Sequence, residues 1–154
     1  MEFFVYLALF SPLLGSLIAA LFAMKKKVLF TGIVTSSLLG LSTLSSFYLL
    51  YFIYTTNEVI QVELMQWINI GNINVSFSFV VDYISVVMMC VVTLVSTMVH
   101  IHSIGYMEDD KGFNRYFAYL SAFVFSMLIL VMSDNFLGLF IGWEGVGLCS
   151  WLLI

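Results

Sequence analysis

Five long apolar runs constrain this chain more than any motif in it. They occupy residues 3–24, 28–54, 80–106, 113–132 and 136–154. Each run is about as long as the roughly 20 apolar residues that an α-helix needs to cross about 30 Å of hydrocarbon. The sequence therefore predicts an all-α, polytopic transmembrane helix bundle with five spans.

The composition excludes most other classes of protein. Of 154 residues, 62% are hydrophobic and only 9% are charged, against about 45–50% and about 25% in ordinary soluble domains. A soluble chain of this size cannot bury so much apolar surface. Soluble enzymes and secreted disulfide scaffolds are excluded. Nucleic-acid binders are excluded too, because no basic stripe follows a phosphate backbone.

The segment between the second and third runs has a different period. Val62, Leu64, Gln66, Ile68 and Ile70 alternate with Glu63, Met65, Trp67 and Asn69, and a second alternating stretch follows Gly71 and Asn72. Period-two runs around a Gly-Asn turn are typical of a β-hairpin. We expect three parts: residues 1–54 with two spans, residues 55–79 as an extracytoplasmic hairpin, and residues 80–154 as the start of a further helical domain.

The positive charges predict an orientation in the membrane. All five lie in the loops after the first and third spans: Lys25, Lys26, Lys27, Lys111 and Arg115. These two loops share one side of the membrane, and the loops on the other side carry none. By the positive-inside rule the N-terminus is extracytoplasmic. The first run is not a signal peptide, because its charges follow the apolar stretch instead of preceding it.

The last run extends to residue 154 without a polar flank. From Phe136 to Ile154 there are 19 residues, or about 28 Å of helix. We expect the fifth span to be incomplete and the chain to be an N-terminal fragment or truncated product.

Glu144 is the outstanding candidate for chemistry. It lies about 12–13 Å into the fifth span, near the middle of the bilayer. A charge there costs at least about 2.5–3.5 kcal/mol on insertion scales, so such residues usually face a cavity or a partner. Paired with a lysine from another helix, Glu144 exchanges a proton; the plainer alternative is a protonated carboxyl that bonds a neighbouring helix. Gly138, Gly142, Gly145 and Cys149 form a small-residue stripe from which Glu144 points away.

His100 and His102 are weaker candidates, as possible proton relays. Imidazole titrates near neutral pH, although an interfacial histidine with satisfied hydrogen bonds is the commoner case. Two residues apart on a helix, they project to nearly opposite faces, which argues against a shared metal site. Cys90 and Cys149 lie alone inside apolar runs, as small core residues do. Without a CxxC cluster, haem motif or nucleotide loop, the chain carries no redox cofactor and no metal of its own.

Several segments together resemble the large antiporter-like membrane subunit of proton-pumping NADH:quinone oxidoreductase, called subunit L or chain five. They are residues 81–85, 99–107, 115–120, 133–135 and, most specifically, 142–154, with the letters GWEGVGLCSWLLI. Trp151 and Ser133 depart mildly from the family pattern, which has tyrosine and alanine more often at these positions. The resemblance covers essentially the whole chain.

The resemblance implies a site and a setting. Glu144 matches the carboxylate that pairs with a lysine on a later broken helix, and His100 and His102 match a signature of the third helix. NADH, FMN, Fe–S clusters and quinone are expected in partner subunits, with protons as the transported species. The implied location is the bacterial inner membrane, or the mitochondrial inner membrane as the alternative. Every lysine here lies in a loop, so the fragment alone is not expected to pump.

Two other functions remain open at this point. The large subunit of a multi-subunit cation/proton antiporter, or of a membrane-bound hydrogenase, shares the Trp143-Glu144-Gly145 segment. The stretch from Ser103 to Met107 favours the L-type branch. An inert helical bundle, in which Glu144 merely bonds its neighbours, is the structural alternative.

Overall fold

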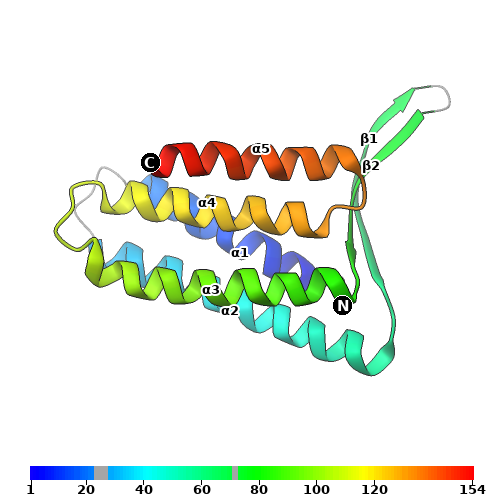
Figure 1. The fold of residues 1–154 in the computed structure, drawn as a ribbon, viewed down its shortest axis with the longest axis horizontal. Coiled ribbons are helices and arrows are strands. Elements are labelled where there is room, and N and C mark those ends of the chain that lie inside the picture. The colour runs from blue at the N-terminus through cyan, green and yellow to red at the C-terminus, as the bar shows by residue number, and fades with distance from the viewer. Residues whose placement is uncertain (23–27, 71–72) are drawn as a thin grey trace.

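The computed structural model describes residues 1–22, 28–70 and 73–154. In chain order its elements are α1 (Glu2–Leu21), α2 (Val28–Thr56), β1 (Ile60–Ile70), β2 (Ile73–Val81), α3 (Tyr83–Tyr106), α4 (Phe113–Met132) and α5 (Phe136–Leu153). The five helices lie side by side along one axis, and the two strands cross one end of the bundle (Figure 1). All five are long and apolar enough to cross a membrane. The predicted helix bundle with a small hairpin is confirmed.

The core lies where α1, α2, α3 and α4 meet beneath the base of the hairpin. Its largest fully buried side chains include Leu9, Leu49, Phe79, Met89 and Leu128. α5 packs against α4 at the edge of the bundle (Figure 1). One side of α5 is therefore covered and the other is free.

The predicted and observed helix boundaries differ by more than one residue at three places. The third helix begins at Tyr83 instead of residue 80, because Val80 and Val81 extend strand β2. α2 continues to Thr56, two residues beyond the predicted end. α1 ends at Leu21, and the predicted continuation through residues 23–24 lies outside the described residues, as do the three adjacent lysines and the Gly71–Asn72 turn.

β1 and β2 pair antiparallel, as the alternation predicts, but with two irregularities. The register shifts between Glu63 and Met65 and again between Gln66 and Ile68. Each shift is a β-bulge, which adds one residue to β1 and reverses its alternation. Met65 consequently lies opposite Phe77. The predicted placement of Gln66 on the face of Val62 was wrong, because a bulge leaves no signature in the alternation itself.

Asp82 sets the start of α3. Its carboxylate accepts a hydrogen bond from the backbone N–H of Ser85 at 2.7 Å, in the geometry of a helix N-cap. This bond from Ser85 is the main reason why the pKa of Asp82 lies below its usual value. Next to it, the hydroxyl of Tyr83 shares its one proton between two acceptors, the carbonyl oxygen of Ile53 at 3.1 Å and the side-chain oxygen of Asn57. The start of α3 is thereby fastened to the end of α2.

The hairpin is also fastened to the joint between α4 and α5. Ser78 Oγ donates to the carboxylate of Asp134 at 3.0 Å, and Asn135 Nδ2 donates to the carbonyl of Ser76 at 2.7 Å. Asn135 also caps α5, because its side-chain oxygen accepts from the N–H of Gly138 at 2.9 Å. One residue thus fixes both the start of α5 and the position of β2.

We predict that the loop before β1 and the turn before α4 lie on opposite sides of the membrane. In a cysteine-free background, Glu58→Cys should react with an impermeant maleimide on intact cells, and Lys111→Cys only after permeabilisation. Both side chains are exposed. The physical reason is the retention of positive charge on the cytoplasmic side. Labelling of Lys111→Cys on intact cells would contradict the orientation.

We also predict that Asp82→Ala lowers the free energy of unfolding by about 0.5–2 kcal/mol, the usual cost of losing an N-cap. Because folding lowers this pKa, the stabilisation is present above about pH 4 and disappears as the pH falls through the folded pKa. Thermal unfolding of the full-length protein in detergent at pH 7 and at about pH 2, below the folded pKa, measures both effects. Asp82→Asn is the control, since asparagine also caps helices but does not titrate there. An equal loss in Asp82→Ala and Asp82→Asn would count against the capping role.

Candidate functional site

Two glycines of the small-residue stripe of α5, Gly142 and Gly145, pack closely against α4. A Cβ atom added at Gly142 would lie 2.6 Å from the backbone nitrogen of Leu130, and one added at Gly145 would lie 2.6 Å from Ser126 Oγ. Both distances are shorter than real side chains tolerate. Glycine at these positions is therefore what lets the two helices approach so closely.

This contact fixes the direction of Glu144. Two residues beyond Gly142, and so about 200° around the helix, Glu144 lies on the side of α5 away from α4, and its side chain is exposed. Within the described part of the chain, no hydrogen bond or ion pair involves its carboxyl. The described cations Lys111 and Arg115 lie in the turn before α4 and in its first turn. The carboxyl that the sequence singles out is thus presented on the free face of α5.

His100, on α3, is in contrast fully buried. Its Nδ1 lies 2.9 Å from the carbonyl oxygen of Ser96, its Nε2 lies 3.1 Å from Ser121 Oγ, and its ring meets the edge of Phe117 at 5.6 Å between centroids. A carbonyl oxygen only accepts hydrogen bonds, so Nδ1 carries the proton of the neutral ring. Nε2 then accepts from the hydroxyl of Ser121 on α4. If Nε2 gains a proton, the direction of this hydrogen bond must change, so that Nε2 donates to Ser121 Oγ.

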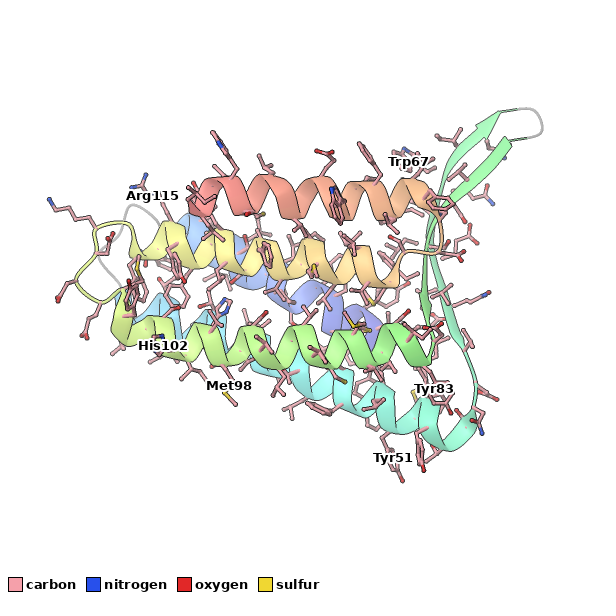
Figure 2. The ribbon with its side chains drawn as sticks, viewed as in Figure 1. Tyr51, Trp67, Tyr83, Met98, His102 and Arg115 are labelled. Atoms are coloured by element: carbon pink, nitrogen blue, oxygen red, sulfur yellow. The ribbon has the colours of Figure 1, made fainter. Side chains whose placement is uncertain are left out.

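His102 points the other way, as its spacing from His100 predicts. It is exposed on α3 (Figure 2), and its ring stacks on Tyr106 at 6.1 Å between centroids. The two histidines share no site, and within residues 1–22, 28–70 and 73–154 no three metal-binding side chains come together.

The structure also does not bring His100 and Glu144 together. His100 contacts α4 through Ser121, whereas α5 lies against α4 at Ser126 and Leu130. Five residues along α4 correspond to about 140° around the helix, so α4 stands between the two candidate groups. Any connection between them runs around or along α4.

The sequence analysis missed a set of buried hydroxyl groups that bridge the helices. Thr43 Oγ1 lies 2.8 Å from Thr97 Oγ1, Ser42 Oγ donates to the carbonyl of Ala8 at 2.6 Å, and Ser103 Oγ lies 3.1 Å from the hydroxyl of Tyr116. These contacts join α2 to α3, α2 to α1, and α3 to α4. The available signal was the recurrence of serine and threonine inside the apolar runs, since hydroxyl groups in hydrocarbon seek partners on neighbouring helices.

Comparison with known proteins confirms the resemblance stated above. Residues 67–117 match the family model described as NADH-ubiquinone oxidoreductase (complex I), chain 5 N-terminus. NADH-quinone oxidoreductase subunit L of Campylobacter jejuni is 53% identical over 154 residues, which is 100% of this chain and 24% of the relative. Subunit L of Neisseria meningitidis serogroup B (strain MC58) is 47% identical over 147 residues, covering 93% of this chain and 22% of the relative.

A relative named NADH-ubiquinone oxidoreductase chain 5, from Dictyostelium citrinum, is 41% identical over 143 residues, again 93% of this chain and 21% of the relative. The chain therefore spans about a quarter of the length of the curated relatives it matches.

We predict that Ser121→Ala destabilises the full-length protein by about 1–3 kcal/mol, because it leaves the buried Nε2 of His100 without a donor. Thermal unfolding in detergent measures the loss. His102→Gln is the matched control and should change stability by less than about 0.5 kcal/mol, as exposed substitutions do. In ¹⁵N spectra of histidine-labelled protein, neutral His100 should carry its proton on Nδ1. A proton on Nε2, or an unchanged stability of Ser121→Ala, would refute the assigned bonding.

Proposed function

Since this chain is homologous over its whole length to NADH-quinone oxidoreductase subunit L, a membrane subunit of complex I involved in proton translocation, we propose that it forms the first part of such a subunit. In this role it takes part in moving protons across the membrane, coupled to electron transfer from NADH to quinone. Other subunits of the complex hold NADH, FMN, the Fe–S clusters and quinone. The single observation that carries the proposal is the carboxyl of Glu144, which pairs with none of the described residues, on the free face of a helix apolar enough to span a membrane.

The energetic argument concerns the surroundings of that carboxyl. Glu144 lies eight residues into α5, about 12 Å from its start. An ionised carboxyl exposed to lipid at this depth costs at least about 2.5–3.5 kcal/mol. A lysine on a helix packed against the free face removes this cost by pairing with it. Such a pair changes its charge when a proton arrives or leaves, which is the elementary step of proton translocation.

His100 supports the proposal as a second proton-exchanging group. Its Nε2 contacts Ser121 Oγ in the interior of the bundle, and a hydroxyl both donates and accepts. Ser121 can therefore hand a proton to His100 or take one from it. The exposed His102 lacks such an enclosed contact and is the weaker candidate.

The proposed setting is a bacterial inner membrane with the N-terminus outside the cytoplasm. The chain is an integral membrane protein by its five apolar helices. The bacterial relatives named above favour this membrane, and the distribution of lysine and arginine favours the orientation.

We predict that Glu144→Gln in the full-length protein, assembled in its complex, slows proton translocation by about tenfold or more. The amide has the shape of the carboxyl but cannot exchange a proton, and a positioned acid–base group contributes about 10²–10⁴-fold to such a step. Dye quenching in proteoliposomes driven by NADH and quinone measures the rate.

Two matched variants accompany this experiment. Glu144→Asp keeps a carboxyl and should retain most of the rate. Glu58→Gln removes an exposed carboxyl outside the helices and should leave the rate unchanged. Normal pumping by Glu144→Gln in an intact complex would favour the inert structural bundle instead.

A further inference from the structure

The hairpin is longer than the end of the bundle that it covers. Its base crosses the ends of the helices, and its far part continues beyond α5 on the side away from α4 (Figure 1). The hydrogen bond from Asn135 to the carbonyl of Ser76 marks the point where β2 passes the start of α5. We call the part from Met65 to Ile70 and from Ile73 to Phe77 the hairpin overhang.

The side of the hairpin that faces the core remains apolar along the overhang. Phe79, at the base, is 1% exposed in the core. Its ring meets the edge of Phe77 at 5.4 Å, and Phe77 meets the edge of Trp67 at 6.3 Å between centroids. Trp67 is 44% exposed and Met65, opposite Phe77, is 57% exposed. The rings of Phe79, Phe77 and Trp67 thus form an aromatic ladder from the core outward. At its outer end, Trp67 and Met65 are only partly covered by the described residues.

The overhang projects to the side of α5 that carries Glu144. Figure 2 shows Trp67 on the hairpin near the start of α5. If the free face of α5 bordered lipid, Glu144 at its middle would meet hydrocarbon without a partner, at a cost of at least about 2.5–3.5 kcal/mol when ionised. This cost favours a covering of protein over lipid on this face, and the overhang extends over the end of whatever packs there.

We propose that Met65, Trp67 and Phe77 form a docking surface for the extracytoplasmic end of a transmembrane helix that packs against the free face of α5. The helix comes from a later part of the same polypeptide, because the relatives are about four times as long as this chain. It presents aliphatic or aromatic side chains to the overhang, since the ladder offers apolar area and ring edges. The first bulge in β1, between Glu63 and Met65, contributes to this surface by placing Met65 on the face of Phe77.

The docking proposal depends on the proposed identity of the chain as part of a membrane subunit, but not on proton transfer by Glu144. Its test therefore measures cross-linking instead of proton pumping. A photo-crosslinking benzoylphenylalanine replaces Trp67 in the full-length protein within its native membrane, and mass spectrometry identifies the captured peptide. We expect a peptide from the end of a transmembrane segment downstream of residue 154 in the same polypeptide.

Neighbouring positions serve as controls. The same group in place of Gln66, which pairs with Ser76 on the opposite side of the hairpin, should capture this peptide at least about tenfold less. The group in place of Met65 repeats the test if the Trp67 variant does not assemble. Capture of lipid alone, capture of another subunit, or equal capture from positions 66 and 67 would each overturn the proposal.

The same cross-linking in a Glu144→Gln background separates the two proposals. Normal pumping by this variant would refute the proton-transfer role of Glu144, and continued capture of the downstream peptide would still support the docking surface.

Discussion

The close approach of α4 and α5 decides how the candidate site is presented. A Cβ at Gly142 would collide with the backbone of Leu130, so the glycine side of α5 can lie this close to α4 only because it carries no side chain there. That contact turns Glu144 to the opposite side. The direction of the carboxyl is therefore a consequence of packing between small residues and not of any bond that the carboxyl itself makes.

A second constraint positions the ends of the helices. Asn135 caps α5 and holds β2, Asp82 caps α3, and Tyr83 binds the end of α2. Asp82 and Asn135 stand at the starts of α3 and α5, and these helix starts lie at the end of the bundle that the hairpin crosses (Figure 1). The base of the hairpin thus holds the helix ends in place, and its far part forms the overhang. Helix ends carry unsatisfied backbone groups, which explains why polar residues gather there in an otherwise apolar chain.

The interior of the bundle is apolar but not uniformly so. His100 and a set of serine and threonine hydroxyls bridge the helices from within. Glu144 lies outside this interior, on the other side of α4. The described helices thus present two separate titratable side chains, one enclosed between α3 and α4 and one on the free face of α5.

The sequence by itself determined the five spans, the hairpin, the depth of Glu144 in α5 and the divergence of the two histidines. These follow from local periodicity, because helical and strand repeats decide which residues share a face. Only the tertiary structure decided that His100 is the buried histidine and that Ser121 is its partner, since both depend on where α3 meets α4. The bulges that turn Met65 toward Phe77, and the reach of the hairpin past α5, were equally invisible in the sequence. They arise from pairing and packing between segments far apart in the chain, and a one-residue shift in register leaves no trace in local composition.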